Sequence, residues 1–338
     1  MELSGCHFLF HPVVENLGGK RLPDSRLRLT KAYLLDSEVD TRSSSAESIS
    51  SAPLNQDPIM KMLKTKTLTA VGLWLFATNV HAEVKVDKDV SYGKHERNVL
   101  DVYWDTDYKN APVVFTIHGG AFKNGSKAYC NKDMRDLYMA KGCIVVSPNY
   151  RLKKEGTSIT KDDCALDVAM AVAYIQANAK KYGGDPGRIV ATGASAGGYI
   201  SAQIAYNKKW NWPADAKYKP EKLNIVGWFG NSPYLPRYVV RDLGVNDAPG
   251  FVMYGGKKEH PATPAQQGHA MQEIFKQKGV WSKMVSIDSM GHCPGKRVLF
   301  APRTRDKATY EAFNQFLDLV CYGKGEPKGG DVIEVTRE

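Results

Sequence analysis

Apolar positions after residue 83 fall into short continuous runs that alternate with longer stretches of helical period. The runs at 112–117, 143–147 and 224–229 hold few polar residues, which is typical of strands buried on both faces of a parallel sheet. In residues 168–179 and 310–320, apolar side chains recur three or four positions apart and predict amphipathic helices. The same alternation predicts further strands at 188–192, 250–256 and 281–287, and further helices at 132–141, 197–206 and 264–278. This order predicts an α/β fold with a mostly parallel central sheet and helices on both faces.

Two features refine this architecture. The first two segments, 84–92 and 98–104, have no helix between them, so we expect an antiparallel pair at one edge of the sheet. Only 21 residues separate Phe229 from Phe251, a connection too short for a large insertion. We therefore expect little or no lid over the carboxyl ends of the strands.

A serine between glycines, in Gly193–Gly197, follows the apolar run at 188–192. This pattern is typical of a sharp strand-to-helix turn, where small flanking residues avoid collisions and the serine hydroxyl stands clear of the backbone. The five-residue pattern is common by chance, so its context decides its value. Ser195 is the predicted nucleophile.

The strand at 112–117 leads into the glycine-rich segment His118–Phe122. Glycines let backbone N–H groups approach a developing alkoxide closely, so this loop is a candidate oxyanion hole. We assign Gly119, Gly120 and Ala121 to it, together with the amide of Ala196 that follows the nucleophile. We expect His118 to brace the loop without taking part in the chemistry.

Gly291 and His292 follow the strand predicted at 281–287. A histidine on such a loop could accept the proton of the serine, because a neutral imidazole nitrogen is a general base near neutral pH. His292 is thus the predicted base, and the order along the chain is serine, acid, histidine.

Several motifs in the same order carry a family resemblance: Leu100–Tyr103, His118–Phe122, Asn149–Leu152, Asp185–Pro186, Gly193–Gly198 and Gly291–His292. With them the chain resembles the α/β-hydrolase superfamily, and within it carboxylesterases of the hormone-sensitive-lipase and feruloyl-esterase-like type. The resemblance runs from about residue 84 to 322. It implies the α/β-hydrolase fold and hydrolysis of carboxylic esters, short acyl or aryl esters or carbohydrate-linked ones, through an acyl-enzyme, with no cofactor. The resemblance also implies that Arg151 and Asp167 pair with each other and stabilise the scaffold.

The resemblance places the acid of the triad after the strand at 250–256, where the chain has Glu259. The family pattern usually has Asp there, and the longer side chain of Glu can still reach the far imidazole nitrogen. Asp247 and Asp288 remain alternatives, although the first precedes the strand and the second lies only four residues from His292. The predicted triad is Ser195, Glu259 and His292.

Two other functional classes share this scaffold. A peptidase of the prolyl-oligopeptidase type has the same catalytic domain, but this chain has no room for an accessory propeller. A non-catalytic adhesion module would lack a triad member, whereas all three positions are filled here. Tyr206, Trp210 and Trp212 flank or lie in a polar insertion at 207–220, where they could stack on sugar rings or pack locally.

The amino-terminal part of the chain has a different character. Residues 60–66 form a short basic region, residues 68–77 are apolar, and Val80–Ala82 has the small-x-small pattern of a signal-peptidase cleavage site. Together they predict a secretory signal peptide over 60–82 and a secreted or periplasmic enzyme. Residues 1–59, with a serine-rich stretch, are expected to be a mis-assigned or disordered extension. The expected catalytic domain is then 83–322, followed by a tail over 323–338.

Charge and cysteine content exclude some partners. The net charge of +10 is spread along the chain without a basic block or a nucleic-acid motif, so we expect no nucleic-acid partner and no stable membrane insertion. No metal-binding spacing occurs, and we expect no metal. Of the six cysteines, Cys6 falls in the expected extension. The other five are Cys130, Cys143, Cys164, Cys293 and Cys321, an odd number, so at least one stays unpaired; a bridge between Cys130 and Cys164 is one hypothesis. The sequence leaves the oligomeric state open.

Overall fold

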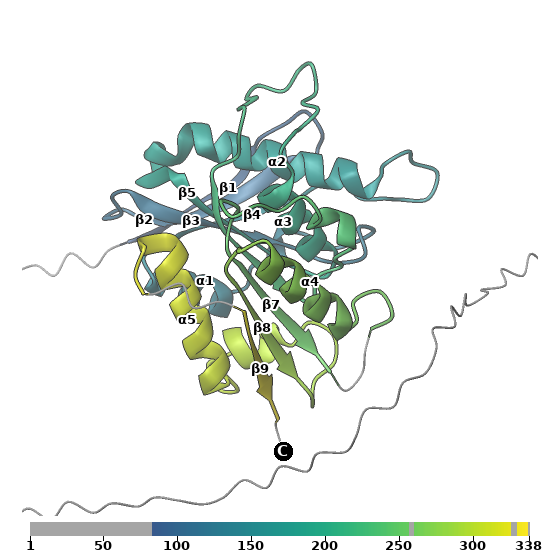
Figure 1. The fold of residues 1–338 in the computed structure, drawn as a ribbon. Coiled ribbons are helices and arrows are strands. Elements are labelled where there is room, and N and C mark those ends of the chain that lie inside the picture. Colours follow the sequence, from purple (N-terminus) through teal and green to yellow (C-terminus); the bar gives the residue numbers. More distant parts are fainter. Residues whose placement is uncertain (1–82, 257–259, 326–329, 337–338) are drawn as a thin grey trace, which may run out of the picture. The chain divides into compact units, whose positions relative to one another are not determined.

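The computed structural model describes residues 83–256, 260–325 and 330–336. The predicted extension at 1–59 and the predicted signal peptide at 60–82 lie outside these residues. A nine-stranded sheet in the order β1-β2-β4-β3-β5-β6-β7-β8-β9 forms the centre of the fold (Figure 1). Its strands are β1 (Val84–Ser91), β2 (Val99–Asp105), β3 (Ala111–Ile117), β4 (Ile144–Pro148), β5 (Gly184–Ala194), β6 (Ile225–Asn231), β7 (Gly250–Gly255), β8 (Ser282–Ile287) and β9 (Asp331–Val335).

The strand directions follow the expectation. β1 pairs with β2, and β2 with β4, in antiparallel fashion, while every other pair is parallel. β3 and β4 are buried along their whole length, as continuous apolar runs predict. The prediction of a mostly parallel sheet with an antiparallel edge is confirmed.

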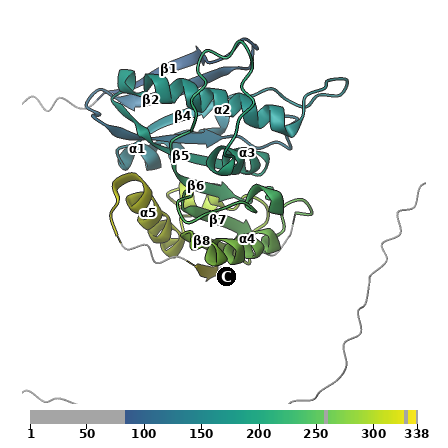
Figure 2. The ribbon, with the colours of Figure 1, turned by 45° about the horizontal axis from the view of Figure 1, so that its top comes forward.

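Helices cover both faces of this sheet (Figures 1 and 2). They are α1 (Lys132–Ala140), α2 (Lys161–Asn178), α3 (Ala196–Tyr206), α4 (Ala265–Gln277) and α5 (Lys307–Tyr322). One buried cluster joins α2, α3 and α4 to the sheet, and a second joins α1 and α5 to its other face. The layered α/β prediction is therefore confirmed.

Local signals account for where the helices begin. Asn131 caps α1, and the Thr160 hydroxyl accepts a hydrogen bond from the Asp163 amide at the start of α2. The Asp163 carboxylate accepts one from the Thr160 amide in return, which completes a capping box. Asp306 caps α5 in the same way as Asn131. These caps satisfy amides that a helix leaves without partners in its first turn.

The carboxyl-terminal part differs from the expectation. We expected residues 323–338 to be a tail, but they contain β9, which pairs in parallel with β8 at the edge of the sheet. The strand escapes detection because only Val335 among its five residues is buried, so it lacks an apolar run. Backbone hydrogen bonds to β8 hold it in place, together with Val335 and Ile333, which pack on the core cluster of α1 and α5.

The cysteine hypothesis is wrong as well. The five cysteines of the described residues are free thiols. Cys130 belongs to the core cluster with α1 and α5, whereas Cys164 belongs to the cluster with α2 and α3. Because the sheet separates these clusters, the two thiols cannot form a bridge.

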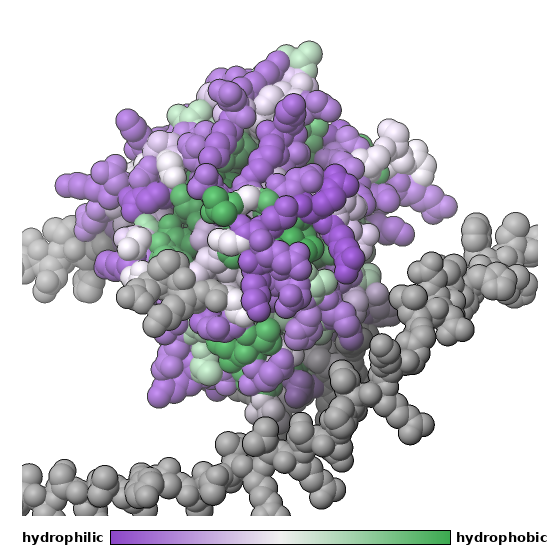
Figure 3. Space-filling view, viewed as in Figure 1, coloured by the Kyte–Doolittle hydropathy of each residue, from purple (hydrophilic) through white to green (hydrophobic). Residues whose placement is uncertain are grey.

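The connection between β6 and β7 is short, as expected. It contains the 3-10 turn Arg237–Val239, and its residues Leu235, Val240 and Leu243 are buried against the core. The connection packs onto the domain instead of forming a large lid. The face drawn in Figure 3 is mainly hydrophilic, with its apolar residues in small separate patches. No helix in the part of the chain described here has the length and hydropathy of a membrane span.

Candidate active site

Ser195 lies between the end of β5 and the start of α3. Its backbone has φ 54° and ψ −117°, a conformation that L-residues rarely adopt. The side chain makes no capping hydrogen bond to α3, so the hydroxyl is not committed to the helix. Such strain costs on the order of 1–3 kcal/mol and persists only where surrounding contacts impose it. The structure therefore holds Ser195 on the sharp turn that its sequence predicts.

Backbone contacts impose this geometry. The Ser195 amide donates to the Asn231 carbonyl at 3.0 Å, and its carbonyl accepts from the Tyr234 amide at 3.1 Å. A Cβ at Gly197 would lie 2.3 Å from the Ile117 carbonyl oxygen and 2.4 Å from that of His118. Any larger residue there would push α3 away from β3, so glycine is required for this close approach.

The loop that follows β3 lies directly beside the serine. A Cβ built on Gly119 would be 3.2 Å from the Ser195 Cβ, which places the Gly119 backbone against the turn. Gly120, Ala121 and Phe122 have positive φ angles of 102°, 52° and 62°. The structure thus brings the predicted oxyanion loop, together with Ala196 at the start of α3, around Ser195.

His118 stabilises the oxyanion loop through a contact with the Gly119 carbonyl and through stacking on Tyr150. Its Nδ1 is 2.8 Å from the Gly119 carbonyl oxygen, and its ring stacks on Tyr150 with centroids 4.1 Å apart. The Tyr150 hydroxyl in turn donates to the His118 carbonyl at 2.9 Å. Burial lowers the pKa of His118 to about 4, so the ring is neutral at neutral pH and can donate from Nδ1. These contacts give His118 the bracing position that we expected.

His292 follows β8 on the neighbouring loop. Its Nδ1 is 2.9 Å from the Thr263 hydroxyl oxygen, and its ring stacks on His260 with centroids 4.4 Å apart. Burial lowers the pKa of His292, and the charge of His260 lowers it further. The imidazole therefore stays neutral below its usual titration range. With a proton on Nδ1 donated to Thr263, Nε2 is free to accept one.

The predicted acid, Glu259, lies outside the described residues. The two alternatives are engaged elsewhere or exposed. Asp247 pairs with Lys208 and accepts from the Gly244 amide at 2.8 Å, while Asp288 is exposed at the end of β8. Among the described residues, the hydrogen-bond partner of His292 Nδ1 is Thr263. No sequence pattern marks this threonine, because its contact with His292 depends on how the segment before α4 meets the loop after β8.

Asn231 joins the two halves of the site. Its carbonyl accepts from the Ser195 amide, and its side-chain oxygen accepts from the Gly295 amide at 3.1 Å. The next residue, Ser232, accepts from the Cys293 amide at 2.9 Å. The end of β6 thus fixes the nucleophile turn and the histidine loop relative to each other, a role that sequence analysis missed.

Cys293 adjoins the histidine but is not a second nucleophile. Burial raises the pKa of its thiol to about 12, so the reactive thiolate is absent at neutral pH. Its sulfur donates to the Asn231 carbonyl at 3.5 Å, and its φ is 58°. The residue shapes the turn after His292.

Ser195, His292 and the Gly119–Ala121 segment line one cavity of about 980 Å³, at the carboxyl edge of the sheet. The cavity also contains His260 and has a mainly apolar wall. Its size suits a small organic substrate or part of a larger one. In the ranges that the structure describes, no group of three potential ligands is arranged to hold a metal ion.

The structural pair expected beside the site is confirmed. Arg151 Nη2 lies 2.7 Å from Asp167 Oδ1, and the Arg151 amide donates to Asp167 Oδ2 at 2.8 Å. Asp167 is buried at the centre of α2, so this pair ties the loop after β4 to the helix.

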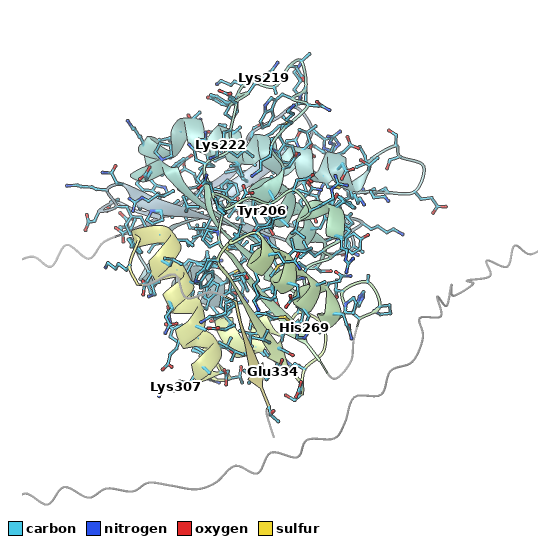
Figure 4. The ribbon with its side chains drawn as sticks, in the orientation of Figure 1. Tyr206, Lys219, Lys222, His269, Lys307 and Glu334 are labelled. Atoms are coloured by element: carbon cyan, nitrogen blue, oxygen red, sulfur yellow. The ribbon has the colours of Figure 1, made fainter. Side chains whose placement is uncertain are left out.

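The aromatic residues near the insertion at 207–220 separate into different roles. Tyr206 is buried and donates to the Ala248 carbonyl at 3.2 Å (Figure 4). Trp212 donates from its indole nitrogen to the Pro220 carbonyl at 3.2 Å, which is local packing. Trp210 lines a separate cavity of about 630 Å³ with Lys161.

Comparison with known proteins gives consistent similarities. The BD-FAE family model matches residues 100–235. Over 145 residues the chain is 34% identical to LipM of Mycobacterium tuberculosis, a probable carboxylic ester hydrolase, covering 42% of this chain and 32% of that protein. Over 280 residues it is 26% identical to esterase LipQ of the same organism, covering 71% and 64%. The chain thus spans less than two thirds of the length of these curated relatives.

Solved structures show the same fold. The butyrate-bound esterase 2 of Thermogutta terrifontis matches with a TM-score of 0.58 at 19% identity, covering 72% of this chain and 96% of that one. A truncated carbohydrate esterase from gut microbiota matches with a TM-score of 0.55 at 19% identity, covering 69% and 96%.

Proposed function

We propose that the chain is a carboxylesterase of the α/β-hydrolase fold, and that it hydrolyses carboxylic esters with Ser195 as nucleophile. The observation that carries the proposal is the convergence of Ser195, the Gly119–Ala121 backbone and His292 on one cavity. The three groups follow the carboxyl ends of three different strands, β5, β3 and β8. A hydroxyl, amide donors and a neutral imidazole are the groups that acyl transfer needs.

In the proposed reaction, Nε2 of His292 accepts the Ser195 proton as Oγ attacks the ester carbonyl. The oxyanion is bound by amides of the loop at Gly120 and Ala121 and by the amide of Ala196. Each such donor contributes on the order of 2.7–4 kcal/mol to transition-state stabilisation. His292 then protonates the leaving alcohol, and water attacks the acyl-enzyme by the same route to release the acid.

We assign the acid role to Glu259, with Thr263 as a second partner of His292 Nδ1. A carboxylate there would stabilise the imidazolium that forms during attack. The Thr263 hydroxyl oxygen, 2.9 Å from Nδ1, can accept the Nδ1 proton, and in that role it favours the tautomer that leaves Nε2 unprotonated.

The proposed substrates are short acyl or aryl esters, including esters on carbohydrate. The short connection between β6 and β7 leaves the cavity without a large lid, which suits a bulky alcohol. A butyrate-bound esterase and a carbohydrate esterase among the structures of the same fold support this range.

We also propose that the enzyme is exported, on the basis of the signal-peptide pattern at 60–82. Expression of the gene in a bacterial host, followed by intact mass measurement of the periplasmic or secreted protein, tests this. A mature protein that begins near Glu83 supports export. A protein retained in the cytoplasm with residues 60–82 attached contradicts it.

Kinetics of Ser195→Ala test the catalytic proposal. We expect hydrolysis of 4-nitrophenyl butyrate to fall to background while the melting temperature stays near the wild-type value. Ser158→Ala, in the exposed loop before α2, is the matched control and should retain full activity. Turnover by Ser195→Ala at the wild-type rate would overturn the assignment.

A further inference from the structure

Two cations lie on the wall of the catalytic cavity and have no part in the proposed chemistry. Lys296 and Arg297 line the same cavity as Ser195 and His292, and both are exposed. They begin the π-helical turn Lys296–Phe300. Turns of this kind occur frequently at functional sites.

The turn has one apolar and one charged side. Val298, Leu299 and Phe300 are buried in the core cluster with α1 and α5. The two cations that precede them therefore face the cavity and solvent. The sequence alone did not reveal this division, because a five-residue π-turn has no recognisable period.

Backbone hydrogen bonds hold the turn in place. The Gly295 amide donates to Asn231 Oδ1 at 3.1 Å, and the Arg297 amide donates to the Pro294 carbonyl at 2.9 Å. On its far side, Arg305 donates to the Leu299 carbonyl at 2.8 Å. The same asparagine that anchors the nucleophile turn thus also anchors the segment that carries the cations.

Among the described residues, no carboxylate is paired with either of these two cations. Some other cations of the domain have carboxylate partners, such as Lys127 with Asp101 at 2.7 Å and Arg188 with Asp185 at 2.7 Å. In the described part of the chain, no ion pair involves Lys296 or Arg297, and the residues that line the cavity include no carboxylate. Two adjacent positive charges with no carboxylate among the described residues that line the cavity favour an anion in the space that they face.

We propose that Lys296 and Arg297 select esters that carry a carboxylate on their acyl or alcohol part. This inference rests on the proposed esterase function and specifies its substrate class. The neutral reacting carbonyl is bound at Ser195, while the pair attracts a negative group elsewhere on the same molecule. No change in the proposed chemical steps is required.

Matched ester pairs test the inference with the full-length enzyme. On the alcohol side, 4-acetoxybenzoate is compared with its methyl ester, and on the acyl side, mono-4-nitrophenyl adipate with 4-nitrophenyl hexanoate. The measured quantity is the ratio of kcat/KM for the charged ester to that for the neutral ester. A ratio of this kind cancels general losses of activity.

We expect the double variant Lys296→Gln/Arg297→Gln to lower this ratio about tenfold in at least one pair, and the affected pair identifies the side that carries the anion. Molar salt should reduce the wild-type preference, because exposed charges are screened. The charge-conserving variant Lys296→Arg/Arg297→Lys should retain it.

Lys219→Gln/Lys222→Gln serves as the charge-matched control. Both lysines are exposed (Figure 4). They precede the amino-terminal end of β6, whereas the cavity lies at the carboxyl ends of the strands, and neither lines it. The inference is overturned if the ratio is unchanged in both pairs or falls equally in the control. A wild-type enzyme that hydrolyses neither neutral ester would instead refute the proposed function, so the two failures are distinguishable.

Discussion

Removing the hydroxyl of Thr263 tests how His292 is held in its active tautomer. Thr263 is 4% exposed, and its oxygen lies 2.9 Å from His292 Nδ1. Thr263→Val keeps the size and shape of the side chain but leaves the Nδ1 proton without this acceptor. The net contribution of one such hydrogen bond is about 0.5–1.5 kcal/mol. At about 1.36 kcal/mol per tenfold, its loss predicts a decrease in kcat/KM of roughly 2- to 13-fold.

The assay is hydrolysis of 4-nitrophenyl butyrate by wild type, Thr263→Val and Thr263→Ser. The serine variant keeps the hydroxyl and should stay within a few fold of wild type. Thermal unfolding of all three proteins separates catalytic loss from misfolding. Wild-type kcat/KM in a folded Thr263→Val protein, or an equal decrease in both variants, would refute the reasoning.

Three other variants test separate parts of the site and its scaffold. Glu259→Gln should lower kcat by on the order of 10²- to 10⁴-fold, because a neutral amide cannot stabilise the imidazolium. A kcat within a few fold of wild type would remove Glu259 from the triad. His260→Gln should move the acid limb of kcat/KM to higher pH. The charge of His260 lowers the pKa of His292, so its removal raises that pKa. His292 then becomes protonated, and stops acting as a base, at a higher pH. An acid limb that stays in place or moves to lower pH contradicts this reasoning. Asp167→Ala should destabilise the fold by roughly 2 kcal/mol in urea unfolding, less than a fully buried pair because the Arg151 side chain is 24% exposed. An unchanged unfolding midpoint would show that the pair contributes little.

The sheet and its helices could be predicted because their residues are buried in regular patterns. β3 and β4 are apolar throughout, and α5 buries Phe313, Leu317 and Val320 on one stripe. β9 could not be predicted, because an edge strand with one buried residue depends more on backbone pairing than on side-chain burial.

In the candidate site too, some residues could be predicted from the sequence and others could not. Ser195, His292 and the loop at Gly119 could be proposed because each follows a strand and carries a local sequence pattern. Asn231 and Thr263 could not, since their contacts arise only when β6 and α4 are packed beside the loop after β8. The positions of such supporting residues follow from tertiary structure and leave no local signal.

Labelling with a phosphorylating inhibitor tests the central proposal most directly. Paraoxon reacts with a serine only where a base and an oxyanion hole activate it. Intact mass and peptide mapping of the treated enzyme should show one diethylphosphoryl group on Ser195, and none on the His292→Gln variant. A folded wild-type enzyme that gains no adduct, or gains it on a different residue, would contradict the account.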